Sequence, residues 1–375
     1  MKSKLKNICD LINEKISANE LINNNLASTY VSTESMLPNK RGITKPSSIP
    51  SKGTTTAYKK DDVLLSNIRP YFKKIWSANY DGVCSNDVLV FRAKNTADAN
   101  FLYYVLANDD FFVYSMATSK GTKMPRGDKA SIMKYEVESF DLNTQRKIAS
   151  ILKPIDKKIE LNNAINNNLE QQAQAIFKSW FIDFEPFSNR KPSEWSVSTL
   201  GKVSIMGAGG DKPQNVSPIK TDLYEYPIYS NGLSNEGLYG FTDKPKISEE
   251  SVTVSARGTI GFVCLRHIPY VPIVRLVTLI PKPEIISAKY LYLWLKQLHI
   301  TGTGTTQQQL TVPDFQKTEI LVPSQEIVTL FTATVEPIFE KIWFNQNENE
   351  KLSSLRDTLL PKLMTGELDV SDTEI

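Results

Sequence analysis

The sequence is short of the residues that build metal sites and many catalytic centres. Its 375 residues include three cysteines, Cys9, Cys84 and Cys264, and two histidines, His267 and His299. Three cysteines so far apart form neither a disulfide framework nor a pair of metal ligands, so we expect buried free thiols. A lone histidine is more often a core or surface residue than a catalytic one. We therefore expect no metal site and no catalytic histidine or cysteine.

Long apolar runs and recognisable catalytic motifs are also missing. No run reaches the ~18 apolar residues that a membrane-spanning helix needs, and the N-terminal MKSKLKNICDLINEK has no apolar region of a secretion signal. There is no GxxxxGKS or GxxxxGKT phosphate loop, no HExxH and no carboxylate cluster at nuclease spacing. Residues 207–210 (GAGG) lack the spacing of a dinucleotide-binding loop, so we interpret them as a turn. These absences predict a soluble, cytoplasmic binding protein without a catalytic residue or a cofactor of its own.

Basic charge is concentrated in two separate segments. Residues 1–142 hold 20 basic and 15 acidic side chains, and residues 188–322 hold 14 and 11, whereas residues 323–375 hold 4 and 10. The whole chain has a net charge of +3. Imbalances of this size are common by chance, so charge alone is a weak indication of nucleic-acid binding.

The chain contains an internal repeat. KPIDKKI (153–159) recurs as EPIFEKI (336–342) at an offset of 183 residues. Both segments continue with seam residues in alternating steps of three and four, a pattern typical of coiled coils, and both have asparagine at the same two positions. The predicted seam consists of Ile155, Ile159, Asn162, Asn166, Leu169 and Ile176 in the first helix and of Ile338, Ile342, Asn345, Asn349, Leu352 and Leu359 in the second.

The asparagines in the seam predict two helices that pair in one register. They lower stability, but a shifted pairing would bury an amide against leucine. The simpler alternative is two long helices that pack elsewhere and tolerate polar residues. Pro154 and Pro337 interrupt the two patterns, and proline removes a helical hydrogen bond. We therefore expect a short leading helix to break at each proline before the main helix starts.

The basic segments repeat as well. VLLS (63–66) aligns with VTVS (252–255), and FLYY (101–104) with YLYL (290–293), both at offset 189. Each pair predicts a strand followed by an amphipathic helix. We therefore predict an α+β protein with approximate two-fold symmetry. Two similar α/β domains, 1–142 and 188–322, alternate in it with long helical regions, 143–187 and 323–370, and a tail covers 371–375.

Polar residues of the predicted loops suit contacts with DNA. Arginine can chelate the acceptor edge of guanine, asparagine and glutamine match adenine, and a lysine-rich loop suits phosphates. For any single residue, simple solvation is the commoner explanation. The candidate DNA-binding residues are Asn67, Arg69, Lys120, Thr122, Lys123 and Arg126 in the first domain and Ser230, Asn231, Ser255, Arg257, Thr305, Gln307, Gln308 and Gln309 in the second.

Several segments resemble a known family. LEQQAQAIFKSWFIDFEPF (169–187) and LRDTLLPKLMTGEL (355–368) resemble the two helical signatures of the specificity subunit of type I restriction–modification enzymes. DVLLSNIRPYFKK (62–74), CSNDVLVFRAK (84–94), YPIYSNG (226–232) and GTTQQQL (304–310) resemble its target-recognition domains. The resemblance covers nearly the whole chain. It implies that each domain reads one half of a split, asymmetric DNA site and that the helices form an antiparallel coiled coil separating the domains.

The resemblance also implies partners. These are double-stranded DNA, modification subunits, two of which are expected, and restriction subunits, with no membrane. The modification subunits dock on the helices, hold S-adenosylmethionine and methylate adenine, and the restriction subunits use ATP and Mg²⁺ to cut. This chain would carry no catalysis and no cofactor.

Two features depart from the family's helical pattern, and three alternatives to the family's function are open. The prolines depart from the helical pattern. Arg356 stands opposite Ala173 in the repeat, so it is expected either to disturb the seam or to mark a docking contact. One alternative is a coiled-coil scaffold with peptide-binding domains and no DNA specificity. The others are a self-contained nuclease or methyltransferase and a reader that serves a methylation-only complex.

Overall fold

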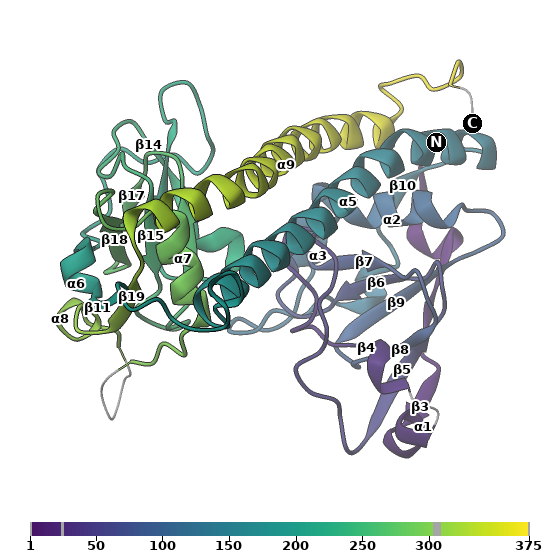
Figure 1. Ribbon diagram of the computed structural model, residues 1–375. Helices are drawn as coiled ribbons and strands as arrows, with labels where there is room; N and C mark the ends of the chain where they lie inside the picture. The colour runs from purple at the N-terminus through teal and green to yellow at the C-terminus, as the bar shows by residue number, and fades with distance from the viewer. Residues whose placement is uncertain (1, 24–25, 303–308, 374–375) are drawn as a thin grey trace. The chain divides into compact units, whose positions relative to one another are not determined.

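The chain folds into two compact units, each with one globular α/β domain. The computed structural model describes residues 2–23, 26–302 and 309–373. Unit 1 comprises Met1–Asn162 and Asn347–Ile375, and unit 2 comprises Asn163–Gln346. Two long helices, α5 (Leu142–Phe181) and α9 (Gln325–Thr365), each contribute one part to unit 1 and one part to unit 2 (Figure 1).

The domain of unit 1 is built on two four-stranded sheets, with strand orders β2-β9-β6-β7 and β3-β5-β8-β4. Neighbouring strands are antiparallel except β4 and β8, and a further antiparallel pair joins β1 to β10. The strands are β1 (Lys2–Lys4), β2 (Cys9–Ile12), β3 (Lys15–Ser17), β4 (Tyr30–Val31), β5 (Thr54–Tyr58), β6 (Val63–Ser66), β7 (Ile75–Ser77), β8 (Gly82–Cys84), β9 (Val88–Ala93) and β10 (Glu136–Glu138). The helices are α1 (Ala18–Asn23), α2 (Ala99–Ala107), α3 (Asp109–Ala117) and α4 (Lys129–Ile132), with 3-10 turns at Leu5–Asn7, Leu26–Thr29 and Pro70–Phe72.

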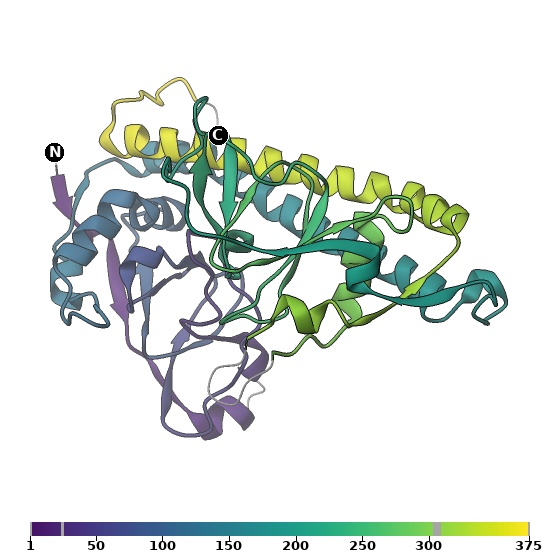
Figure 2. The same cartoon turned by 90° about the vertical axis from the view of Figure 1, so that its left-hand side faces the viewer.

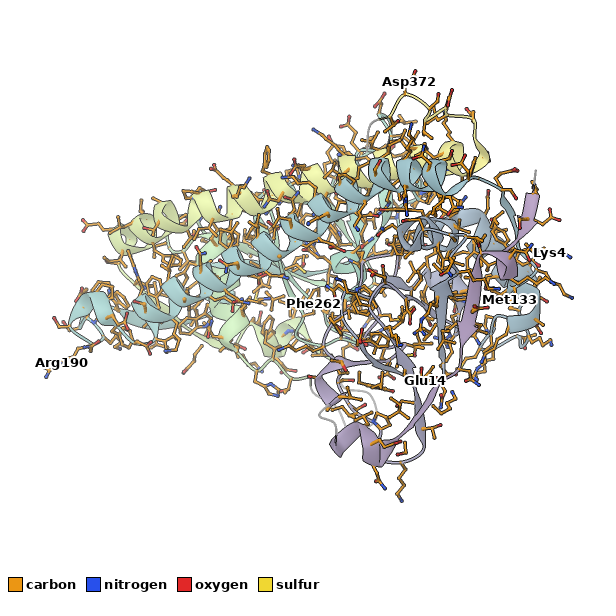
Figure 3. All side chains as sticks on the ribbon, turned by 90° about the vertical axis from the view of Figure 1, so that its right-hand side faces the viewer. Lys4, Glu14, Met133, Arg190, Phe262 and Asp372 are labelled. Atoms are coloured by element: carbon orange, nitrogen blue, oxygen red, sulfur yellow. The ribbon has the colours of Figure 1, made fainter. Side chains whose placement is uncertain are left out.

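Helix α2 packs on the β2-β9-β6-β7 sheet and completes the core of unit 1. It starts at Asp98, whose carboxylate accepts hydrogen bonds from the amides of Asn100 and Phe101, as an N-cap should. The β1–β10 pair closes one edge of the unit, where the Lys6 amide donates to the Met133 carbonyl oxygen (3.1 Å). Figure 3 shows the labelled Lys4 and Met133 together at this edge.

Unit 2 repeats the main sheet of unit 1. Its strand order, β12-β18-β15-β16, matches β2-β9-β6-β7 in chain order and in antiparallel pairing, and α7 packs on it as α2 does. A smaller sheet has the order β14-β13-β17, and β11 pairs with β19. The strands are β11 (Ser196–Thr199), β12 (Ser204–Ala208), β13 (Tyr226–Tyr229), β14 (Leu238–Thr242), β15 (Ser251–Val254), β16 (Val263–Arg266), β17 (Val271–Pro272), β18 (Val277–Pro281) and β19 (Glu319–Val322). The helices are α6 (Leu200–Val203), α7 (Ala288–Gln297) and α8 (Val312–Phe315), with 3-10 turns at Glu185–Phe187 and Ser234–Gly237.

The long helices pair in opposite directions in each unit. In unit 1 the first part of α5 lies beside the last part of α9, and in unit 2 the last part of α5 lies beside the first part of α9 (Figures 1 and 2). Both parts enter the core of their unit, for example through Leu152 and Leu363 in unit 1 and through Phe177 and Phe331 in unit 2. The predicted α+β class, with similar α/β domains alternating with two long antiparallel helices, is confirmed.

The predicted breaks at Pro154 and Pro337 are wrong, because α5 and α9 continue through them. A proline inside a helix removes one hydrogen bond and clashes with the carbonyl one turn earlier, which costs ~3 kcal/mol. Leu152, Val335 and Phe339, close to the prolines, are buried, and each such burial contributes about 1.5–3 kcal/mol. Packing against the two cores therefore offsets the loss.

Two further expectations concern the cysteines and the membrane. Cys9, Cys84 and Cys264 are buried free thiols, as predicted, and burial raises the pKa of each to about 12. Within residues 2–23, 26–302 and 309–373, no helix combines the length and the apolar character needed to cross a bilayer.

Candidate nucleic-acid interface

In unit 1, the loop after β6 lies against the loop that carries the predicted lysines. The Gly127 amide donates to the Asn67 carbonyl oxygen (3.2 Å), and the Arg69 amide donates to the Pro125 carbonyl oxygen (2.8 Å). Gly127 is closely surrounded, since an added Cβ would lie 2.9 Å from Oδ1 of Asn67 and from Cδ1 of Ile132 and would have to displace these side chains. The predicted DNA-binding residues of unit 1, which come from two distant segments of the sequence, thus lie on two adjacent loops.

The second of these loops presents cations. Its ends are tied by two backbone hydrogen bonds, each of 2.9 Å, between Lys120 and Arg126. The Lys120 ammonium lies 2.5 Å from Asp128, and this hydrogen bond, with one from the Ser131 amide, lowers the pKa of Asp128 to about 2. The Arg126 guanidinium lies 3.2 Å from Asp87. All four predicted residues of the loop are exposed: Lys120, Thr122, Lys123 and Arg126.

The turn after β6 is strained and incompletely hydrogen-bonded. Arg69 has a left-handed backbone conformation (φ 51°). Its Nε and the Oδ1 of Asn67 are buried and have no hydrogen-bond partner within the part of the chain that the structure describes. A buried unpaired polar atom costs about 1–3 kcal/mol, and strained backbone and unpaired groups cluster at functional sites. Stability alone therefore does not account for this turn.

Unit 2 builds the same junction of loops. The Leu310 amide donates to the Ala256 carbonyl oxygen (3.0 Å). Residues 256 and 310 follow residues 67 and 127 at the offsets of the two internal repeats, 189 and 183, so this bond is the counterpart of the one between Asn67 and Gly127. Across the junction, Nη2 of Arg257 donates to Oε1 of Gln309 (2.9 Å). The structure thus brings together two predicted base-contacting side chains.

The Asn231 side chain, predicted to contact DNA, makes two hydrogen bonds to the backbone of neighbouring loops. Its Nδ2 donates to the Val274 carbonyl oxygen and its Oδ1 accepts from the Ala256 amide, both at 2.7 Å. Because both ends of the amide are held by backbone, the side chain fixes the loop before Arg257.

Ser230 and Ser255, also predicted in unit 2, contribute less to an exposed surface. The Ser230 hydroxyl donates to the Gly237 carbonyl oxygen (3.4 Å), and Ser255 is 2 % exposed. Thr305, Gln307 and Gln308 lie outside the residues that the structure describes.

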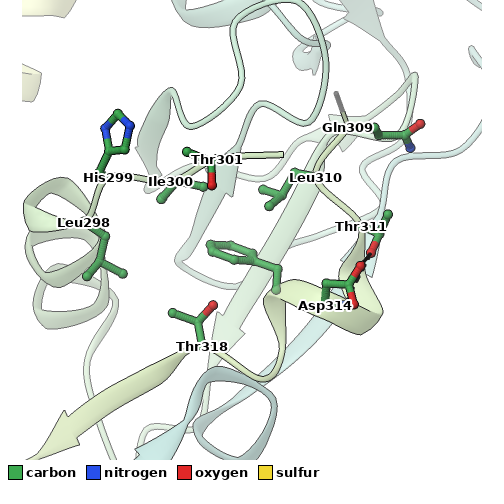
Figure 4. Close-up of a pocket in the computed structure, with 10 residues that line it drawn as sticks. Leu298, His299, Ile300, Thr301, Gln309, Leu310, Thr311, Asp314 and Thr318 are labelled. Atoms are coloured by element: carbon green, nitrogen blue, oxygen red, sulfur yellow. Dashed lines mark hydrogen bonds between the residues drawn. The ribbon is translucent and has the colours of Figure 1, made fainter. Parts of the chain in front are cut away.

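A pocket of about 260 Å³ adjoins Gln309 (Figure 4). Figure 4 shows Thr311 and Asp314 facing one another, and the Thr311 hydroxyl donates to Asp314 (2.8 Å). The Asp314 amide donates in turn to the Thr311 hydroxyl, which caps α8. Thr311 and Asp314 therefore cap the start of α8 and do not form an acid–base pair. The other lining residues are Leu298, His299, Ile300, Thr301, Leu310, Phe315 and Thr318.

The seam asparagines form two polar layers between the helices. In unit 1, Nδ2 of Asn162 donates to Oδ1 of Asn349 (2.9 Å) and to Glu348 (2.8 Å). In unit 2, Nδ2 of Asn345 donates to Oδ1 of Asn166 (2.8 Å). All twelve predicted seam residues are buried or half-buried.

Arg356 finds a partner inside unit 1. Its side chain lies 2.8 Å from Asp156 of α5 and 2.9 Å from Asp357, and the Tyr104 hydroxyl donates to the other oxygen of Asp156 (2.9 Å). The residue is 9 % exposed. It is therefore a paired, buried cation in the helix pair, and its ion pair compensates for its polarity in the seam.

Two features of the unit 1 loops are not among the predicted site residues. Asp87 orients Arg126 from a different loop, and no local pattern indicates such a pairing. Tyr71 and Phe72, 48 % and 37 % exposed, follow Arg69 directly. Here a signal existed, because two aromatic residues between basic ones in RPYFKK are typical of nucleic-acid-binding segments.

Within the described residues, no three histidine, cysteine, aspartate or glutamate side chains gather where they could hold a metal ion. The polar groups that do gather, in both units, are donors and acceptors on paired loops. Such an arrangement suits hydrogen bonding to a ligand that carries phosphates and base edges.

Comparison with known proteins agrees with this geometry. The family described as "Type I restriction modification DNA specificity domain" matches residues 1–171 and 192–354. The chain belongs to this family. Its members are specificity subunits, the non-catalytic components of type I restriction systems.

Individual relatives are similar along most of their length. The chain is 29 % identical to the type I restriction enzyme HindI specificity subunit of Haemophilus influenzae, over 83 % of this chain and 87 % of the relative. It is 27 % identical to the MjaIX specificity subunit of Methanocaldococcus jannaschii, over 74 % and 71 %. Its fold resembles the crystal structure of a type I restriction–modification S subunit from M. genitalium. That likeness has a TM-score of 0.55 at 17 % identity and covers 97 % of this chain and 96 % of the other.

Proposed function

We propose that this specificity subunit reads a bipartite, asymmetric DNA site, one half with each globular domain. The domains are residues 1–142 and 188–322, and the helical regions 143–187 and 323–370 act as a coiled-coil spacer that sets the gap between the halves. The observation that carries the proposal is the repeated loop junction, closed by the Gly127–Asn67 bond in unit 1 and the Leu310–Ala256 bond in unit 2. Two similar junctions suit two short stretches of base pairs.

The residues divide by chemistry into base readers and phosphate contacts. Arg257 and Gln309, paired at 2.9 Å, carry groups that match guanine and adenine edges. Arg69 and Asn67 are the residues of the same chemical kinds at the unit 1 junction, where Oδ1 of Asn67 is buried. Lys120, Lys123 and Arg126 suit phosphates, and their exposure fits that role. Thr122, Thr305, Gln307 and Gln308 stay candidates, and Ser230, Asn231 and Ser255 support the loops.

Methylation and cleavage of the DNA would be carried out by partner subunits. Two modification subunits would dock on the helical regions, carry S-adenosylmethionine and methylate adenine in the site. Restriction subunits would use ATP and Mg²⁺ to cut unmodified DNA. The specificity subunit itself would need no cofactor, because its task is to select the DNA sequence.

The test is a map of adenine methylation in the host genome with this gene intact and deleted. We expect a motif of two short defined halves around a fixed unspecified gap, present in the intact strain and absent after deletion. A methylation pattern that does not change, combined with purified complex that binds DNA without a steep dependence on salt, would overturn the proposal and favour a protein scaffold.

Single substitutions then separate the two kinds of contact. Arg257→Ala should relax the sequence at one position of one half-site, because a base contact is lost. Lys123→Ala should weaken binding to all sequences and reduce the slope of log affinity against log salt by about one. Lys202→Ala, which removes an exposed lysine of α6 outside the paired loops and outside the helical regions, is the matched control and should change neither quantity.

A further inference from the structure

Two exposed aromatic rings stand at the tip of the turn after β6. Tyr71 and Phe72 are 48 % and 37 % exposed, and their ring centroids lie 4.6 Å apart. Aromatic side chains are usually buried, so adjacent exposed rings on an ordered turn indicate a surface that another molecule covers.

The turn that carries these rings is held rigidly. The residues on either side of it, Arg69 and Lys73, both have left-handed backbone conformations with φ of 51°. Backbone hydrogen bonds tie it to two other loops: Arg69 donates to Pro125 (2.8 Å), and Asn39 donates to the carbonyl oxygen of Phe72 (2.8 Å). A strained turn fixed from two sides presents its rings in one defined place.

The surroundings of the rings are cationic. The Lys74 ammonium lies 5.8 Å from the centroid of the Phe72 ring. Lys73 and Lys40 flank the turn and pair with Asp109 at 2.7 and 2.9 Å, and Lys40 also lies 3.9 Å from Asp357. Four cations, Arg69, Lys40, Lys73 and Lys74, therefore stand against three carboxylates, Asp109, Asp357 and Glu34, and this excess of one positive charge favours a polyanion over an acidic protein. The Arg69–Pro125 bond also joins the turn to the loop of Lys120 and Arg126.

We propose that Tyr71 and Phe72 form an aromatic DNA contact, stacking on a base of the unit 1 half-site that is partly unstacked in the complex. The contact rests on the proposed DNA-reading function and extends it. Unit 1 would select its half-site by how easily a base step opens as well as by base edges. Stacking of this kind tolerates any base, whereas the opening of a step depends on sequence.

The experiment uses the complete complex with its modification subunits and a duplex carrying the site found by methylation mapping. The variant Tyr71→Leu/Phe72→Leu keeps apolar bulk on the turn but removes both aromatic faces. We expect its affinity for the specific duplex to fall by about tenfold or more. We also expect a position-specific fluorescence change of 2-aminopurine in the unit 1 half-site with the wild type, and its loss with the variant.

A matched control lies in the other unit. Tyr239 is 51 % exposed, with the Lys212 ammonium 5.9 Å from its ring centroid. Tyr239→Ala should leave the 2-aminopurine signal of the unit 1 half-site unchanged. A second variant, Tyr71→Trp, keeps an aromatic face and should retain both the affinity and the signal.

The outcomes separate this contact from the proposed function. If the wild-type complex binds no DNA sequence specifically, the proposed function itself is wrong. Specific binding by the wild type, with unchanged affinity and fluorescence in the double leucine variant, would overturn the aromatic contact alone. If the variant loses its modification subunits while its DNA contacts persist, the turn is a protein interface and the proposal is wrong.

Discussion

The ion pair between Arg356 and Asp156 lies in the interior of the helix pair, and its loss should destabilise unit 1. Removing one partner of a buried pair leaves the other charge uncompensated, which costs about 3–5 kcal/mol. We expect Asp156→Asn to lose most of this amount, measured by hydrogen exchange of residues 142–162 and by denaturant unfolding. Asp357→Asn is the control, since Asp357 is also 2.9 Å from Arg356 but its side chain is 52 % exposed. Its effect should stay below about 1 kcal/mol, and equal losses from the two variants would contradict the argument.

His267 should make unit 2 sensitive to acid. Its ring stacks on Trp343 with centroids 4.0 Å apart. Burial, and then the charges of Lys289 and Arg266, lower its pKa from 6.5 to about 4. The folded state therefore binds fewer protons than the unfolded state between these values, so the stabilisation is complete above pH 6.5 and is lost as pH falls towards 4. Because the ring is partly exposed, we expect about 1 kcal/mol.

The measurement is the free energy of unfolding of unit 2 between pH 6.5 and 5, where carboxylates contribute least. His267→Phe keeps an aromatic ring on Trp343 but cannot titrate, so its stability should vary less with pH than that of the wild type. An equal slope in both proteins would show that another group is responsible.

At the scale of the elements, the sequence pattern predicts those helices and strands whose formation depends on residues of the same segment. The heptad steps from Ile155 to Ile176 predict a helix there, and VLLS (63–66) predicts β6, because amphipathic period and β-branched content act within one segment. The predicted breaks at Pro154 and Pro337 are wrong for the opposite reason. Whether a proline ends a helix depends on what the flanking turns bury, and the cores that receive Leu152 and Val335 are assembled from distant segments.

The asparagine layers should lower the stability of the helix pair and at the same time favour one pairing register of the two helices. Replacing Asn162 and Asn349 with leucine turns the unit 1 layer into an apolar contact, and we expect stability to rise by about 1 kcal/mol or more. The same change removes the penalty on shifted pairings, so association between chains should increase. Chemical unfolding and sedimentation velocity measure the two effects. Asn167→Leu, at an exposed position of α5, should change neither stability nor register. Raised stability without any change in association or in DNA spacing would leave the layer with no register role.

At the scale of the whole molecule, the repeat in the sequence predicts two similar domains, but the loop partners could not be predicted. The offset of 189 residues brings β6 and β15 into correspondence from sequence alone. The contacts of Arg126 with Asp87 and of Asn231 with the amide of Ala256 join segments that no periodicity relates. The proposed readout residues lie on such loops, so the sequence predicts the segments that contribute to the candidate site but not how these segments contact one another.

If the helix pair is the proposed spacer, the gap in the DNA site should depend on helix length. Seven residues inserted between Asn162 and Asn166 in α5, and seven between Asn345 and Asn349 in α9, lengthen both helices by one heptad and leave both asparagine layers intact. At 1.5 Å per residue the addition is about 10 Å, or about three base pairs at 3.4 Å each. Methylation mapping should then return the same two half-site sequences with a gap about three base pairs longer. A heptad inserted in α5 alone is the control, because it mismatches the helices and should abolish specific methylation. If the doubly lengthened protein keeps the original gap, the spacing is determined outside the helix pair.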